Sequence, residues 1–172
     1  VVEREPGVFT DELMRHADWV GDHIVDLVAH LNEPLSIRHG DCRTDNMLFT
    51  DDGLVMIDFG VVGSGRPAGD VAYLLSETIP PGPGARATFL RLCREYHDCL
   101  VATGVTDHPL DEFLNDCDIV LAVQAYRVVL IEAAFQASAG SWSGIVSDRF
   151  QVQIFFDGSG HHRQQTANGS RE

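Results

Sequence analysis

The feature that most constrains the fold is a stretch with the pattern of a tight β-hairpin and polar residues at its open end. Two short apolar runs, MLF and LVMI, flank the segment Thr50-Asp51-Asp52-Gly53. Asp-Gly favours a tight turn, because glycine adopts a positive φ at little cost. Since an antiparallel hairpin brings its two ends together, we expect Asp41 and Asn46, which precede it, to converge with Asp58, which follows it.

These three side chains carry the kind of donors that Mg²⁺ prefers. Two carboxylates and one amide oxygen form a hard-oxygen site, and Mg²⁺ takes oxygen ligands while keeping several of its waters. A carboxylate that is not a ligand is free to act as a base. The pattern therefore predicts a magnesium site beside a general base.

The same residues resemble a known family. His39-Gly40-Asp41 followed by Asn46, and then Ile57-Asp58-Phe59-Gly60, are similar to the catalytic and metal-binding loops of the aminoglycoside phosphotransferase and choline kinase family. The sequence HGDCRTDNMLF, with GDVAYLL downstream, is most similar to bacterial small-molecule kinases of that family, including ecdysteroid-kinase-like proteins. Protein kinases share the Asp-to-Asn spacing, but they usually have Arg after the His and an A-P-E segment that this sequence lacks.

The resemblance implies an α+β, protein-kinase-like fold in which a mostly helical C-terminal lobe carries the catalytic hairpin. Kinases of this fold hold the nucleotide phosphates with a lysine of the N-terminal lobe. Here all 12 basic residues are Arg, and no Gly-rich phosphate loop precedes His39. We therefore expect the C-terminal lobe alone, over residues 1–157, with the N-terminal lobe absent. A polar tail at 158–172 is expected to be disordered.

Phosphoryl transfer from ATP requires metal ligands, cationic groups and an acceptor for the hydroxyl proton. We expect Asp41 to orient and deprotonate the attacking hydroxyl, and Asn46 and Asp58 to bind Mg²⁺. Arg43 either neutralises the transferred phosphoryl group or forms a surface ion pair with a neighbour such as Asp45.

Two further residues are expected to support this loop. His39 is interpreted as a hydrogen-bonding support rather than a base, as the resemblance also implies. Asp70 either accepts hydrogen bonds from the loop backbone or caps the helix that follows it. Both roles for Asp70 are structural.

The resemblance places the acceptor among the C-terminal helices, roughly at 85–156. Acidic side chains there are candidates for an amine-binding surface: Glu95, Asp98, Asp116, Asp118 and Glu132. Glu132 stands in an apolar helix, where a carboxylate is costly unless it is paired or faces a cleft. A tertiary ion pair is therefore the alternative to substrate binding for Glu132.

The net charge of −14 argues against nucleic acid or an anionic membrane as a partner. It suits a cationic small molecule, although an acidic surface also favours solubility.

The four cysteines lack C-x-x-C spacing, and Cys93 and Cys117 are expected to be buried thiols. No apolar run approaches the roughly 20 residues of a membrane span, and the acidic start is not a signal peptide, so we expect a cytoplasmic protein.

Apolar periodicity and breaker residues predict the remaining elements. We expect a strand at Leu35–Arg38 and a Gly-rich loop at 59–66, with helices at about 9–31, 67–79, 85–103, 109–138 and 143–156. Three histidines of the first helix, at positions 16, 23 and 30, are interpreted as boundary residues of its apolar face, because seven residues rise about 10 Å along a helix.

The sequence thus predicts an ATP- and Mg²⁺-dependent phosphotransferase acting on a hydroxyl of a small molecule. The alternative is a non-catalytic fragment or binding module that lacks the nucleotide-binding lobe. The two hypotheses differ in whether a companion N-terminal lobe exists, as an upstream segment or as a second chain.

Overall fold

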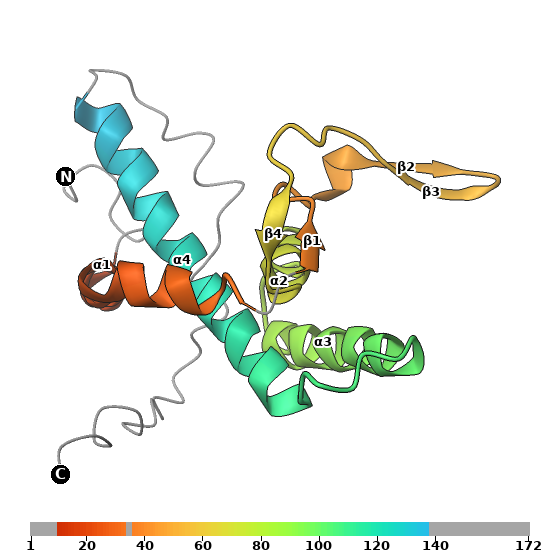
Figure 1. The fold of residues 1–172 in the computed structure, drawn as a ribbon. Coiled ribbons are helices and arrows are strands. Elements are labelled where there is room, and N and C mark those ends of the chain that lie inside the picture. Colours follow the sequence, from red (N-terminus) through yellow and green to blue (C-terminus); the bar gives the residue numbers. More distant parts are fainter. Residues whose placement is uncertain (1–9, 34–35, 138–172) are drawn as a thin grey trace, which may run out of the picture.

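A computed structural model describes residues 10–33 and 36–137 of the protein, with a mostly helical α+β architecture (Figure 1). The elements in chain order are α1 (Asp11–His30), β1 (Ser36–Arg38), the 3₁₀ helix η2 (Thr44–Asn46), β2 (Met47–Thr50), β3 (Gly53–Met56), β4 (Gly63–Gly65), α2 (Ala68–Thr78), α3 (Ala85–Ala102) and α4 (Leu110–Ala137). The helix predicted at 143–156 and the polar tail lie outside the described residues.

Helix α1, which was predicted from about residue 9, begins at Asp11. The Thr10 hydroxyl accepts a hydrogen bond from the Leu13 amide at 3.2 Å, and Asp11 and Glu12 occupy the first turn. A side-chain oxygen at this position satisfies an amide that has no partner inside the helix, and acidic residues favour the positive end of the helix dipole. These local interactions explain why the helix starts here.

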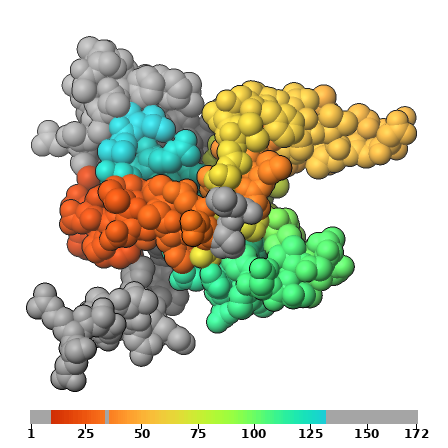
Figure 2. Space-filling view, viewed as in Figure 1, coloured from red at the N-terminus to blue at the C-terminus, as the bar shows by residue number. Residues whose placement is uncertain are grey.

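The predicted hairpin is confirmed. Strands β2 and β3 are antiparallel, with Met47 opposite Met56 and Thr50 opposite Gly53. Gly53 has a φ of +129°, which a residue with a side chain rarely adopts. Figures 1 and 2 show the hairpin projecting away from the helices.

The interpretation of residues 59–66 as a loop without regular structure is wrong in part. Gly63–Gly65 forms β4, which pairs with β1 in antiparallel register. The Ser36 hydroxyl adds a hydrogen bond of 2.7 Å to the Gly65 carbonyl. Backbone pairing with a distant strand therefore orders a segment whose own side chains carry no strand pattern.

The core lies where α2, α3 and α4 pack together. Phe89 of α3 and Phe113 of α4 are fully buried, as are the thiols of Cys93 and Cys117, whose sulfur atoms lie 3.9 Å apart. Both cysteines are buried as predicted. Helix α1 packs across α4 through a second cluster that includes Ala17. Helix α4 thus forms the central support of the described fold.

Apolar side chains are exposed on the hairpin and the segments around it. They include Ile37, Leu48, Phe49, Leu54, Val55, Phe59, Val61 and Val62, with Phe49 at 79% exposure. Exposed apolar patches of this kind often mark interaction surfaces.

Within the residues that the structure describes, no helix has the length and apolarity needed to cross a membrane.

Candidate active site

The loop that follows β1 is held by a carboxylate of α2. Asp70 Oδ2 accepts a hydrogen bond from the His39 amide at 2.6 Å, and Oδ1 accepts one from the Gly40 amide at 2.9 Å. One carboxylate binding two successive amides fixes the direction in which the chain enters the loop, and charge-assisted bonds of this kind are strong. Asp41 therefore follows two anchored peptide groups.

His39 holds two parts of the backbone together. Its Nε2 lies 2.8 Å from the carbonyl oxygen of Ile57, and its Nδ1 accepts a bond of 3.3 Å from the Asp41 amide. A neutral ring protonated at Nε2 satisfies both contacts. The ring is 7% exposed and packs against Phe59 with centroids 4.6 Å apart. Both ring nitrogens of His39 therefore contact backbone groups, one on each side of the hairpin.

The Asp41 carboxylate is oriented by two donors. Asn46 Nδ2 donates to the Asp41 carbonyl at 2.9 Å and to Asp41 Oδ2 at 3.0 Å. The phenol of Tyr73, on α2, donates to Oδ1 at 3.2 Å. Since Nδ2 makes both bonds of Asn46, its amide oxygen is the atom suited to bind a cation.

Asp58 stands at the open end of the hairpin. The Ile57 amide donates to the Asn46 carbonyl at 3.0 Å, while the Ile57 carbonyl receives His39. Asp58 follows directly, with an exposed side chain and a φ of +61°. Aspartate is among the residues that tolerate this left-handed region, and such strain concentrates at functional sites. The hairpin thus brings residue 57, next to Asp58, opposite Asn46.

Arg43 forms an ion pair with Asp45. Partial burial acts to lower the pKa of Arg43, but the hydrogen bond and charge of Asp45, with Tyr73 and Glu77 nearby, raise it above its usual value. The structure therefore contains the surface pair with Asp45 that was the alternative to a phosphoryl contact.

A phenol on α2, beside the loop, and a thiol within the loop have raised pKa values. Burial, followed by the charges of Glu77 and Asp41, raises the pKa of the Tyr73 phenol. Burial, followed by the charges of Asp70 and Asp41, raises the pKa of the Cys42 thiol to about 11. The phenol therefore stays protonated as a donor, and the thiol stays protonated at neutral pH.

The acidic residues predicted to bind an amine do not form one surface. Glu95 and Asp98 are exposed on α3, where Glu95 pairs with Arg91 one turn away at 2.5 Å. Glu132 lies on α4, but its side chain is outside the described part of the structure. Asp116 does not belong to any surface, because it is fully buried and paired with Arg66.

Four residues that contact Asp41 or Asp116 were not predicted from the sequence. Tyr73 contacts the Asp41 carboxylate, and Arg66, His30 and His108 contact Asp116. Tyr73 could have been found, since it lies three residues after Asp70 and so on the same side of α2. His30 is more than a boundary residue, but its partner is distant in sequence and no local pattern indicates it.

An aspartate on a loop, an asparagine after four intervening residues and a second aspartate beyond a hairpin form the pattern that kinase-like phosphotransferases use. The comparison with known families agrees. A family model described as the phosphotransferase enzyme family matches residues 5–100, more than half of the 172-residue chain. The protein belongs to this family, whose protein-kinase-like fold agrees with the architecture described above. No curated protein matches the chain.

Proposed function

We propose that the protein is an ATP- and Mg²⁺-dependent phosphotransferase that transfers the γ-phosphoryl group to a hydroxyl of a small molecule. The observation that carries the proposal is the clamped Asp41 carboxylate, held by Asn46 and Tyr73 on a loop that Asp70 anchors. Positioning and charge neutralisation supply most of the catalysis of phosphoryl transfer, so an immobilised base beside oxygen ligands suits this reaction.

The residues present fit a magnesium ion. Asn46 offers an amide oxygen and Asp58 an exposed carboxylate, and the hairpin joins the two through the Ile57–Asn46 hydrogen bond. Bound there with the nucleotide, Mg²⁺ would neutralise charge on the phosphates. Oxygen donors of this type suit Mg²⁺ better than they suit softer metals.

In the proposed reaction, Asp41 accepts the proton of the acceptor hydroxyl as its oxygen forms a bond to the γ-phosphorus. The bond between that phosphorus and the bridging oxygen breaks, and ADP leaves with the electron pair. The hydrogen bonds from Asn46 and Tyr73 hold the carboxylate in one orientation throughout. The net charge of −14 favours a cationic acceptor.

The test is transfer of labelled phosphate from ATP to a panel of amino alcohols and aminoglycosides. Asp41→Ala should lower the turnover by at least about 10²–10⁴-fold, the usual contribution of general-base catalysis, without unfolding the protein. Asp45→Ala is the matched control, because Asp45 lies in the same segment but is exposed and pairs with Arg43, not with Asp41. Near-normal turnover in Asp41→Ala would refute the assignment of the base.

A second function rests on a different observation. The exposed apolar side chains of the hairpin, and the absence of lysine, favour a binding module or a lobe that works with a nucleotide-binding partner. Such a lobe could come from another segment or from a second chain. Phosphoryl transfer that appears only when such a partner is added would support this reading.

A further inference from the structure

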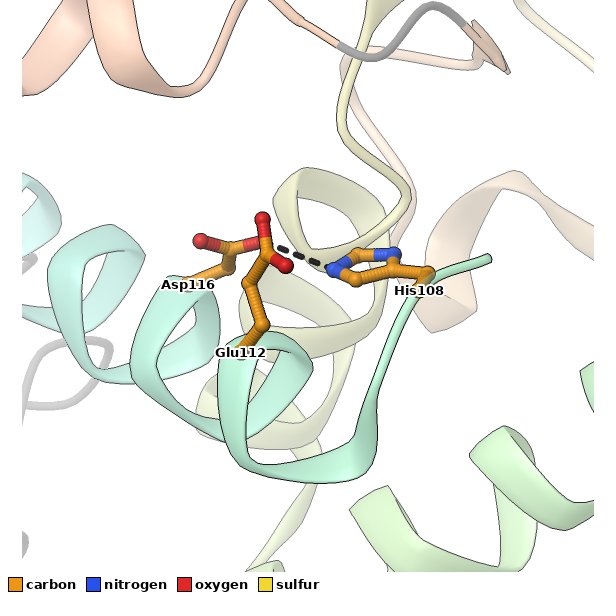
Figure 3. Close-up of side chains that lie close together, drawn as sticks. All are labelled: His108, Glu112 and Asp116. Atoms are coloured by element: carbon orange, nitrogen blue, oxygen red, sulfur yellow. Dashed lines mark hydrogen bonds and ion pairs between the residues drawn. The ribbon is translucent and has the colours of Figure 1, made fainter. Parts of the chain in front are cut away.

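A buried cluster of charged side chains lies outside the loop that carries Asp41. Its centre is Asp116 on α4, whose side chain is 0% exposed. Arg66 Nη1 donates to Asp116 Oδ2 at 2.8 Å, and His30 Nε2 lies 2.7 Å from Oδ1. His108 Nε2 lies 3.1 Å from Oδ2 (Figure 3). The proposed chemistry at Asp41 uses none of these groups. Because buried charged groups are costly unless they are paired, the cluster calls for an explanation of its own.

Three members of the cluster have the geometry of a metal site. His108, Glu112 and Asp116 bring donor atoms within 4.8 Å of one another. Arg66 argues against a metal, because its Nη1 donates to Glu112 at 2.5 Å as well as to Asp116. The guanidinium already supplies the positive charge that both carboxylates need, and a metal ion would have to displace it. Arg66 is therefore the cation of this cluster.

Arg66 also ties together backbone segments that are distant in sequence. Its amide donates to the Leu31 carbonyl at 2.8 Å, and its Nε donates to the carbonyls of His30, at 2.9 Å, and Glu33. Arg66 stands at the junction between β4 and α2. One residue thus joins the end of α1, this junction and the buried carboxylate of α4.

The same junction leads directly to the catalytic loop. The Gly69 amide bonds to the Arg66 carbonyl at 3.1 Å, in the first turn of α2, and Asp70 is the next residue. Asp70 in turn holds the amides of His39 and Gly40. A continuous series of hydrogen bonds and one helix turn therefore runs from Asp116 to the residues just before Asp41.

We propose that Arg66 and Asp116 are positioning residues whose buried ion pair fixes the start of α2 and, through Asp70, holds the loop that carries Asp41. The inference rests on the proposed function only in naming Asp41 as the reacting group. The holding of the loop can be measured without turnover, so the two claims fail separately.

The test is amide hydrogen exchange, resolved by residue with NMR, on the full chain. Asp116→Asn should accelerate exchange of the His39 and Gly40 amides by about tenfold or more, because their anchor loses its fixed position. Amides inside α3, such as that of Phe89, should keep their rates. Asp118→Asn is the matched control: Asp118 lies on the same helix but is half exposed and pairs with Arg86 of α3. This control should leave the exchange rates of both sets of amides unchanged.

Unchanged exchange at His39 and Gly40 in folded Asp116→Asn would overturn the inference. Equal acceleration throughout α3 would also overturn it, since the pair would then support the whole fold and not the loop. If Asp116→Asn does not fold, Arg66→Lys decides in the same way, because lysine keeps the charge but cannot bridge the carboxylate and the carbonyls. Protection in the wild-type protein that requires added Zn²⁺ would overturn the assignment of Arg66 as the cation. If the protein proves not to transfer phosphate from ATP, the expected exchange pattern is unaffected, because the exchange rates do not depend on turnover.

Discussion

The phenol of Tyr73 donates a hydrogen bond of 3.2 Å to Oδ1 of Asp41. The opposite oxygen of that carboxylate is occupied by Asn46, so the two donors approach the carboxylate from η2, just before the hairpin, and from α2. Tyr73 is 9% exposed, and burial together with nearby acidic groups raises its pKa, which keeps the phenol protonated as a donor. The relationship links the orientation of the proposed base to the position of α2.

Tyr73→Phe should therefore lower kcat by about 10–150-fold, since a hydrogen bond to a charged group is worth about 1.5–3 kcal/mol. The KM for ATP should remain unchanged, because the phenol does not contact the proposed metal ligands. Steady-state kinetics measure both constants. Tyr96→Phe is the control, since Tyr96 packs against Phe113 in the core with centroids 5.5 Å apart. A wild-type kcat in Tyr73→Phe would show that this donor does not matter for the reaction.

Gly40→Ala should distort the loop that carries Asp41. Gly40 has a φ of +82°, and a Cβ there would lie 2.4 Å from the backbone carbonyl oxygen of Val61, which cannot move aside as a side chain can. We expect a loss of stability well above the 1–2 kcal/mol or so of a left-handed residue alone, measured by urea unfolding. Gly84→Ala isolates that backbone cost, because its φ of +91° is close to that of Gly40 but nothing lies within 4 Å. Equal losses in both variants would contradict a steric clash at Gly40.

Asp58 offers a way to separate backbone strain from metal binding. Its φ of +61° costs a residue with a side chain about 1–2 kcal/mol, whereas glycine adopts it freely. Asp58→Gly should therefore be more stable than Asp58→Ala by about 1 kcal/mol. Both variants should lose Mg²⁺-dependent nucleotide binding, because both lack the carboxylate. Thermal unfolding and nucleotide titration of the pair provide the comparison, and retained binding in either variant would exclude Asp58 as a metal ligand.

The thiol of Cys42 should react slowly with alkylating agents. Its pKa of about 11 means that the reactive thiolate is a very small fraction at neutral pH and increases as the pH rises toward that value. Iodoacetamide labelling followed by peptide mass spectrometry should therefore modify the exposed Cys99 well before Cys42, and the rate at Cys42 should climb steeply between pH 8 and pH 10 or so. In urea, where burial is lost, the two cysteines should label at similar rates. Rapid labelling of Cys42 at pH 7 in the folded protein would contradict the buried, acidic environment of this loop.

Local sequence patterns predicted most of the described fold. The cap at Thr10, the Asp-Gly turn and the breaker residues around the later helices are local signals, and the structure has elements at those positions. The strand Gly63–Gly65 was missed because glycine and serine carry no strand pattern there. Its order comes from pairing with β1, which lies more than twenty residues away.

The candidate residues of the loop follow one another closely in sequence, so their motif could be recognised without the structure. Asp116 was assigned to a surface because α4 is apolar on nearly all sides, which leaves no polar face by which to orient it. Its partners His30, Arg66 and His108 come from three other segments, and only the folded chain brings them together.

The most direct test of the proposed function is calorimetric titration of the purified protein with ATP, once with Mg²⁺ and once with chelator, compared with Asp58→Ala. The proposed function predicts binding that requires Mg²⁺ and weakens by at least about 10–100-fold in Asp58→Ala, a loss that even outer-shell groups of metal sites produce. Binding that is equally strong with chelator, or unchanged in the variant, would contradict the metal site. A folded wild-type chain that binds no ATP would contradict a self-sufficient phosphotransferase and favour the binding module.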